Sequence, residues 1–254
     1  MRQLIVGNWK MNLTREVGVK LATDIAAAGT ASCDLVLCPP FTLIHSLAEA
    51  LRDSNIALGG QDCSKEASGA FTGDVAPPML VDAGARYVIL GHSERRQYHF
   101  ETDADVRAKT EAAMRSGLVP LICMGETEAE HRAGLAQSVV ATRLDQGLPD
   151  GFNGIVSYEP IWAIGTGLVP SPQYVATMHD FIREKLVTRY GASGNERPIL
   201  YGGSVKPSNA DRLLAISNVN GALVGGASLV ASEFLAIAKA ARGEGSGEPN
   251  KASP

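Results

Sequence analysis

The amino-acid sequence predicts an α/β protein that forms a single closed barrel of eight parallel strands, each followed by a helix, the (β/α)8 architecture. The chain has 254 residues, a length typical of one such barrel. Short apolar runs rich in β-branched residues recur along it, and each is followed by an amphipathic segment. The runs lack strict alternation of apolar and polar residues, which indicates strands buried on both faces, as in a parallel sheet covered by helices.

The strands and helices can be placed in order along the chain. The eight expected strands are residues 4–9, 34–38, 56–61, 87–91, 119–123, 154–159, 198–201 and 221–224. Helices are expected between them, among others at residues 101–116, 127–146, 172–190 and 228–241. Thr102 or Asp103 and Ser171 are suitable helix N-caps, and Gly117 and Gly191 stand where helices should end.

Composition and charge argue against nucleic acid and membrane partners. Lys and Arg total 23 against 27 for Asp and Glu, a formal net charge of −4, so no basic excess is available for binding a phosphate backbone. No apolar run approaches the roughly 18 residues of a membrane-spanning helix. The first residues become polar too early for a signal peptide, which predicts a cytoplasmic location.

The small number of cysteines predicts neither a disulfide framework nor a metal site. Cys33, Cys38, Cys63 and Cys123 form no C-x-x-C pair, so reduced thiols are expected. No G-x-G-x-x-G follows a strand and no G-x-x-x-x-G-K-[ST] occurs, which removes the usual nucleotide-binding fingerprints.

Two segments depart from the alternation of strands and helices. Residues 62–78 are longer than the roughly 2–6 residues of a usual βα loop, and we expect this loop to contact a partner. The C-terminal residues have no apolar periodicity and too little hydrophobic surface to fold. The chain is therefore divided into a catalytic barrel domain at residues 1–242 and a disordered tail at residues 243–254.

Polar side chains follow several of the expected strands, at the end of a barrel where active sites are built. Lys10 follows the first strand, His92 the fourth, and Glu159 closes the sixth. Each has a plain structural alternative. The lysine can be a solvated loop residue, the histidine a packed core residue, and the glutamate one half of an ion pair.

The remaining strand ends suggest a lid and an anion site. Residues 160–167 are apolar and end in small residues, as in a lid that excludes water, although an ordinary packed loop would look similar. Glycine pairs follow the seventh and eighth strands, where they suit either a phosphate held by backbone N–H groups or tight turns. Taken together, a base, an electrophile, a cation and an anion site favour proton abstraction beside a carbonyl group.

The sequence resembles the triosephosphate isomerase family along nearly its whole length, roughly residues 2–242. The motifs that carry the resemblance, in the family's order and spacing, are GNWKMN (7–12), GHSERR (91–96), YEPIWAIGTG (158–167), YGGSV (201–205) and LVGGASL (223–229). The resemblance implies a TIM barrel that interconverts dihydroxyacetone phosphate and D-glyceraldehyde 3-phosphate in glycolysis and gluconeogenesis, without cofactor or metal.

The resemblance also implies roles for individual catalytic residues. Glu159 would be the base that moves the proton between the two carbons, and His92 the electrophile at the carbonyl oxygen, a role for which this family is a standard example. Lys10 would supply positive charge to the anionic substrate, and Asn8 would help to orient it.

Further residues would bind phosphate, support the catalytic groups or contact a second subunit. The phosphate would be held mainly by backbone N–H groups of Gly165, Ser204, Gly225 and Gly226. Glu94 would support Lys10 and Cys123 would pack behind Glu159. Thr72, in the long third loop, would reach toward the neighbour's active site in a homodimer.

Two other functions fit part of the same pattern. A Schiff-base aldolase also uses a barrel, a phosphate site and a strand-end lysine, and borohydride would trap its covalent adduct. A non-catalytic phosphate-binding barrel would keep the glycines but has no physical need for Lys10, His92 and Glu159 together.

Overall fold

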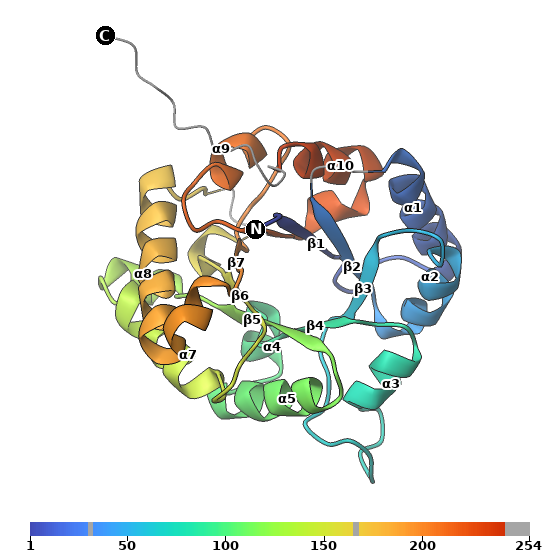
Figure 1. The fold of residues 1–254 in the computed structure, drawn as a ribbon, viewed down its shortest axis with the longest axis horizontal. Helices are drawn as coiled ribbons and strands as arrows, with labels where there is room; N and C mark the ends of the chain where they lie inside the picture. The colour runs from blue at the N-terminus through green and yellow to red at the C-terminus, as the bar shows by residue number, and fades with distance from the viewer. Residues whose placement is uncertain (30–32, 165–167, 242–254) are drawn as a thin grey trace.

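The computed structural model describes residues 1–29, 33–164 and 168–241. Within them, eight strands form a closed barrel in sequence order, and every neighbouring pair is parallel, including β1 with β8. Figure 1 looks along this barrel, with the strands at the centre and the helices in a ring around them. The fold expected from the sequence is thereby confirmed.

Each strand lies within one or two residues of its expected position. The strands are β1 (Leu4–Asn8), β2 (Asp34–Cys38), β3 (Ala57–Gly60), β4 (Tyr87–Leu90), β5 (Val119–Met124), β6 (Ile155–Tyr158), β7 (Ile199–Tyr201) and β8 (Gly221–Val224). The expectation was good because parallel strands covered by helices are short and continuously apolar.

The helices surround the barrel. They are α1 (Arg15–Ala28), α2 (Ile44–Ala50), α3 (Pro77–Asp82), α4 (Ser93–Tyr98), α5 (Asp103–Arg115), α6 (Glu128–Arg132), α7 (Ala136–Gly147), α8 (Pro172–Tyr190), α9 (Ala210–Leu214) and α10 (Ala231–Lys239). Short 3-10 turns are η1 (Phe41–Leu43), η2 (Ile161–Ala163), η3 (Gly191–Asn195) and η4 (Gly226–Leu229).

Two expected helices were wrong as single elements. Residues 127–146 divide into α6 and α7, because Gly134 between them has a positive φ of 72° that no helix can contain. Residues 228–241 divide into η4 and α10, with an extended Val230 between them. Both breaks were missed because the spacing of apolar residues that is typical of a helix continues across them.

The helix ends follow the expected capping chemistry. The Thr102 hydroxyl accepts from the backbone N–H of Asp105, whose carboxylate in turn accepts from Thr102, so α5 opens with a capping box. The Ser171 hydroxyl caps α8 by accepting from the backbone N–H of Tyr174 at 3.2 Å, without a reciprocal bond. Gly191, which ends α8, has a left-handed φ of 63°.

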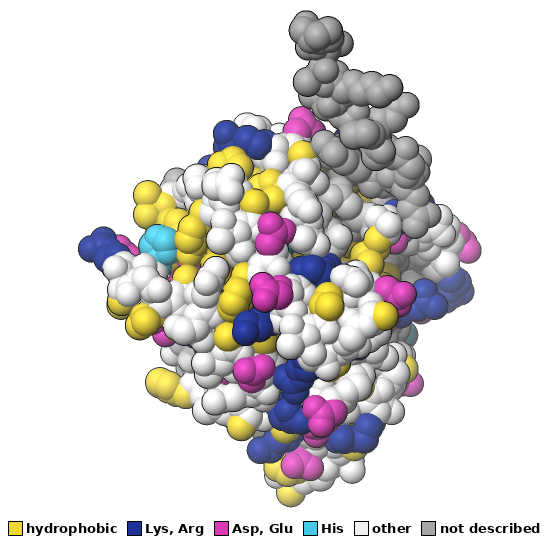
Figure 2. All heavy atoms as spheres, turned by 60° about the vertical axis from the view of Figure 1, so that its left-hand side comes forward, with side chains coloured by type: hydrophobic (Ala, Val, Ile, Leu, Met, Phe, Trp, Pro, Cys, Tyr) yellow, Lys and Arg dark blue, Asp and Glu magenta, His cyan; other side chains and the backbone are white. Residues whose placement is uncertain are grey.

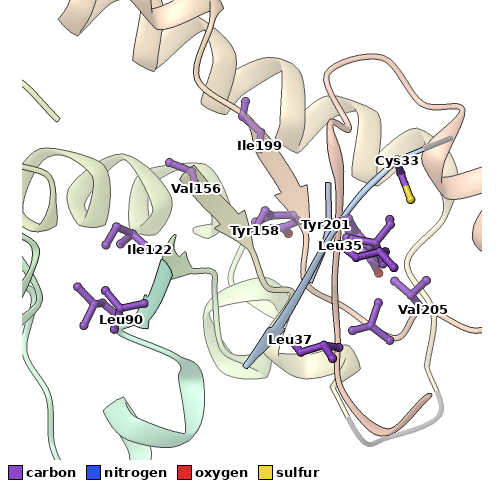
Figure 3. Close-up of a cluster of buried hydrophobic side chains, with 14 of the residues drawn as sticks. Cys33, Leu35, Leu37, Leu90, Ile122, Val156, Tyr158, Ile199, Tyr201 and Val205 are labelled. Atoms are coloured by element: carbon purple, nitrogen blue, oxygen red, sulfur yellow. The ribbon is translucent and has the colours of Figure 1, made fainter. Parts of the chain in front are cut away.

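Side chains on successive strand positions alternate between two apolar layers. One layer fills the barrel and consists of Leu4, Val6, Val36, Cys38, Ile89, Leu121, Cys123, Ile155, Leu200 and Leu223. The other lies between strands and helices, and Figure 3 shows Leu90, Ile122 and Val156 on that outer side. On β6 this alternation puts Ile155 inside, Val156 outside and Ser157 inside, so Glu159 is directed into the barrel.

Buried charges anchor the base of the long loop between β3 and α3, which projects from the barrel in Figure 1. Asp62 pairs with Arg95 at 2.9 Å and with Lys109 at 2.9 Å. Glu101 completes the cluster by pairing with both cations. Burial opposes its ionisation, but hydrogen bonds from Lys109 and Arg95 outweigh this and hold the pKa of Glu101 below its ordinary value. The root of the loop is therefore fixed to α4 and α5.

His179 of α8 makes the stability of the fold depend on pH. Its side chain is fully buried, and burial lowers its pKa to about 4. Between about pH 6.5 and pH 4, His179 is therefore protonated in the unfolded chain but neutral in the folded chain. The free energy of unfolding falls as the pH falls through this range, by about 1.4 kcal/mol per pH unit.

We expect His179→Gln to remove this contribution, because glutamine can still donate to the carbonyl of Asn218 but does not titrate. Urea denaturation at pH 6.5 and pH 5 measures it. Between pH 6.5 and pH 5, the free energy of unfolding of the native chain should fall by about 1.5 kcal/mol more than that of the variant. Equal losses in the two proteins would contradict the prediction.

The outer surface of the described chain carries charges of both signs. On the side of α8, drawn in Figure 2, basic and acidic side chains are interspersed with no extended area of either sign. Among the described helices, none is long and apolar enough to span a membrane.

Candidate active site

The polar strand ends converge on one cavity of about 600 Å³ at the carboxyl end of the barrel. Asn8 and Lys10 reach it from β1, His92 from β4 and Glu159 from β6. The segments that follow β7 and β8, with Ser204, Gly225 and Gly226, complete the lining. The cavity thus combines charged side chains with glycine-rich backbone.

Lys10 is held in an uncommon backbone conformation. Its φ is 53°, in the left-handed region, where a residue with a side chain is strained by about 1 kcal/mol or more. The Asn8 side-chain oxygen accepts from the Lys10 backbone N–H at 3.1 Å. The Lys10 ammonium group donates to Glu94 Oε1 at 2.5 Å. Lys10 and Glu94, which the resemblance associates with each other, are therefore in direct contact.

His92 is both a cavity residue and the N-cap of α4. The strand ends at Leu90, and Gly91 with a φ of 66° turns the chain so that the next residue faces the cavity. Nδ1 of His92 accepts from the backbone N–H of Glu94 at 3.2 Å. An accepting Nδ1 leaves the ring proton on Nε2, which lies 3.5 Å from Glu159 Oε1. His92 therefore presents a hydrogen-bond donor to the cavity.

Glu159 is almost fully buried, with 1% of its surface exposed. Its Oε2 accepts from the backbone N–H of Ser93 at 3.2 Å. Its Oε1 has no hydrogen-bond partner among the described residues. A buried carboxylate with a free oxygen is costly to maintain, and such groups are more common at functional sites than elsewhere.

The environment of Glu159 leaves little room behind the carboxylate. The Cys123 thiol lies next to it, and burial, with a further contribution from the carboxylate, raises the pKa of this thiol well above its ordinary value. A Cβ on Gly202 would come within 2.7 Å of Glu159 Cγ, and one on Gly125 would collide with the Glu159 carbonyl oxygen. Both glycines are needed for this close packing, which fixes the direction of the side chain.

The amide-rich side of the cavity is open to an anion. A Cβ on Gly226 would meet nothing within 4 Å, and one on Gly225 would lie 3.5 Å from Lys10 Cε. Such unshielded backbone is typical of phosphate sites after the seventh and eighth strands of a barrel. Gly165, which was also expected to bind phosphate, lies outside the described residues, as do the last three residues of the lid expected at 160–167.

The start of the expected lid is tied to a buried carboxylate that the sequence analysis missed. Glu126 is fully buried and accepts hydrogen bonds from Tyr158 (3.0 Å), Trp162 Nε1 (2.7 Å) and the Tyr174 hydroxyl (2.8 Å). His131 stacks on the Trp162 ring with centroids 4.2 Å apart. Glu126 therefore joins β6, α8 and η2, the turn where the lid begins.

Other site residues were also missed. The backbone N–H of Ser93, which holds Glu159, leaves no mark in a sequence. Glu126 could have been found as a carboxylate just after an apolar strand, and Gln61 as a polar residue at the end of the third one. Thr72, by contrast, lies exposed on the long loop and does not line the cavity of its own chain.

The arrangement supports chemistry in which a proton is removed and a negative oxygen develops nearby. Glu159 offers an unpartnered carboxylate oxygen, and His92 and Lys10 offer a neutral donor and a cation. Within the described ranges, no group of three His, Cys, Asp or Glu side chains is arranged to hold a metal ion.

Comparisons with known proteins agree in both sequence and structure. The model of the family described as triosephosphate isomerase matches residues 3–241. A triosephosphate isomerase of Afipia carboxidovorans is 54% identical over 250 residues, which cover 94% of this chain and 98% of that protein. One of Granulibacter bethesdensis is 52% identical and covers 94% and 99%. The crystal structure of a triosephosphate isomerase from Bartonella henselae superposes with a TM-score of 0.89 at 45% identity, covering 94% and 99%.

Proposed function

The chain belongs to the triosephosphate isomerase family and interconverts dihydroxyacetone phosphate and D-glyceraldehyde 3-phosphate, a step of glycolysis and gluconeogenesis, and we propose that Glu159, His92 and Lys10 carry out this reaction. The observation that supports the assignment is their convergence on one cavity. His92 Nε2 lies 3.5 Å from Glu159 Oε1, so the donor and the base are close enough together to act on neighbouring atoms of one substrate molecule.

In the proposed mechanism, Glu159 removes the proton from the hydroxyl-bearing carbon beside the carbonyl group and returns it to the former carbonyl carbon. The hydroxyl proton leaves its oxygen, which becomes the new carbonyl oxygen, and a proton is delivered to the former carbonyl oxygen. The carbonyl oxygen becomes negative in the enediolate, and His92 Nε2–H and the Lys10 ammonium group stabilise it. A unit charge at about 4 Å contributes about 4 kcal/mol at an effective dielectric near 20, before desolvation. Asn8 orients the substrate through its position beside Lys10.

The phosphate would lie against the backbone amides of Ser204, Gly225 and Gly226, with Gly165 of the lid as a further donor. Closure of residues 160–167 would exclude water, which protects an enediol phosphate from losing its phosphate group. Glu94 and Cys123 would act indirectly, the first by directing the Lys10 ammonium group and the second by packing behind Glu159.

Turnover in deuterium oxide tests the proton-transfer mechanism. A carboxylate base exchanges the abstracted proton with solvent, so NMR of the product is expected to show deuterium at the carbon beside the carbonyl group. Product free of deuterium at every extent of conversion would contradict a protein base. Borohydride is expected to trap no adduct, because the Lys10 amine is paired with Glu94 as an ammonium group and is therefore no nucleophile.

We further propose that the chain acts as a homodimer in the cytosol. Large apolar side chains are exposed around the loop and the neighbouring β1 and β4 ends, including Met11 (94% exposed), Phe100 (82%) and Tyr98 (66%). Met11, Phe41 and Tyr98 also line a groove beside Lys10 and His92. An apolar groove next to the active site and an exposed loop with Phe71 and Thr72 are complementary features of two copies of one chain.

Thr72→Arg is expected to weaken this dimer, because a charge would be buried without a partner in the interface. Sedimentation should show a larger monomer fraction, and specific activity should fall in step with it. Thr177→Arg, on the exposed surface of α8, is the matched control and should change neither quantity. A fully dimeric and active Thr72→Arg protein would remove Thr72 from the interface.

A further inference from the structure

Lys10 needs an external constraint to stay in its left-handed conformation. Lysine has no intrinsic preference for a φ of 53°, and a free chain would relax to the right-handed or extended region. The direction of its Cα–Cβ bond depends on the two peptide planes that flank the Cα atom. Whatever fixes both planes therefore aims the side chain.

The plane before Lys10 is fixed within its own segment. The Asn8 side-chain oxygen accepts from the Lys10 N–H at 3.1 Å. The Asn12 amide donates to the carbonyl of Trp9, which belongs to the same peptide unit, at 2.7 Å.

The plane after Lys10 is fixed from another strand. Nε2 of Gln61, which directly follows β3, donates one hydrogen to the Lys10 carbonyl at 2.8 Å and the other to the Cys38 carbonyl at 2.9 Å. Both hydrogens of this amide are used, so its position is defined by two bonds. A single side chain thus joins the carboxyl ends of β1, β2 and β3 beside the cavity.

We propose that Gln61 is a positioning residue for the isomerase reaction, which fixes the carbonyl of Lys10 and so directs its ammonium group into the cavity. The proposal rests on the catalytic role proposed for Lys10. Without the amide, the Lys10 carbonyl would lose its partner and the strained backbone would relax, displacing the ammonium group. A displacement of about 1 Å at a catalytic group costs roughly 10²-fold in rate.

A double-mutant cycle tests the proposal. Gln61→Met keeps most of the side-chain volume but cannot donate, and kcat is expected to fall between 10-fold and roughly 10²-fold. Lys10→Met should reduce kcat further. The double variant is expected to match Lys10→Met alone, because Gln61 acts only through Lys10. Inhibition by inorganic phosphate should weaken less in Gln61→Met than in Lys10→Met, since the first variant keeps the Lys10 ammonium group and the second removes it.

Gln3 provides a matched control within the same barrel. Its Nε2 also donates to two carbonyls, those of Leu214 (2.9 Å) and Val219 (3.0 Å), but at the amino-terminal end of β1. Gln3→Met should lower the melting temperature while kcat stays within twofold of the native value. Gln61→Met, which also removes two hydrogen bonds, should lower kcat at least about 10-fold in addition to the melting temperature.

The possible outcomes distinguish a failure of the positioning role of Gln61 from a failure of the catalytic role of Lys10. A native kcat in Gln61→Met, a loss in Gln3→Met as large as in Gln61→Met, or losses that multiply in the double variant would overturn the role of Gln61 alone. An unchanged kcat in Lys10→Met would overturn the role of Lys10 and that of Gln61 with it.

Discussion

Glu159→Gln is expected to lower kcat by about 10²–10⁴-fold, the usual contribution of a positioned general base. The amide has the same shape as the carboxylate but cannot accept the substrate proton. Its side-chain oxygen can still accept from the Ser93 N–H, so the fold and the cavity should persist. A coupled assay of D-glyceraldehyde 3-phosphate conversion measures the loss, with KM expected to change much less than kcat.

Glu159→Asp refines this prediction, because it keeps the base and retracts it by one methylene group. A displacement of this size should cost roughly 10²-fold in kcat. Glu184→Gln, an exposed position on α8, is the control for the same chemical change and should leave kcat unaltered. Near-native kcat in either Glu159 variant would mean that another group removes the proton.

His92→Asn is expected to lower kcat by about 10²–10³-fold, the usual effect of removing one oxyanion donor. Asparagine is an equally good N-cap, so its side chain can replace Nδ1 as the acceptor for the Glu94 N–H at the start of α4. The shorter side chain cannot also bring a donor to the place of Nε2, close to Glu159.

This design separates chemistry from stability at His92. The urea midpoint should stay close to the native value while kcat falls, whereas His92→Ala should reduce both because the cap is lost as well. Unchanged kcat in His92→Asn would exclude His92 as the electrophile. A lowered midpoint in His92→Asn would show instead that the cap is not replaced.

Several features of the fold were predictable because local chemistry decides them. The strands lie in the barrel wall with both faces covered, and only continuous apolar runs can occupy such positions. Thr102 and Ser171 begin helices for the same local reason, since their hydroxyls accept from the first free N–H groups. The break between α6 and α7 was missed because Gly134 interrupts a pattern that otherwise continues as a helix.

The candidate site was predictable only in part. Lys10, His92 and Glu159 could be identified because a barrel brings all strand ends to one edge, whatever their distance in sequence. Gln61 and Glu126 were missed because their roles depend on what they contact rather than on where they stand. Nothing in the sequence says that the Gln61 amide meets two carbonyls, or that Glu126 gathers donors from Tyr158, Trp162 and Tyr174.

The sequence by itself determined the barrel, the order of its strands and the residue types at its carboxyl end, because burial, capping and strand length are properties of short segments. The tertiary structure alone decided the Gln61 bond that fixes the Lys10 carbonyl, the closeness of His92 Nε2 to Glu159 and the free oxygen of Glu159. These features depend on contacts between segments that meet only when the barrel closes. The pattern of residues along the chain does not indicate which groups will make such contacts.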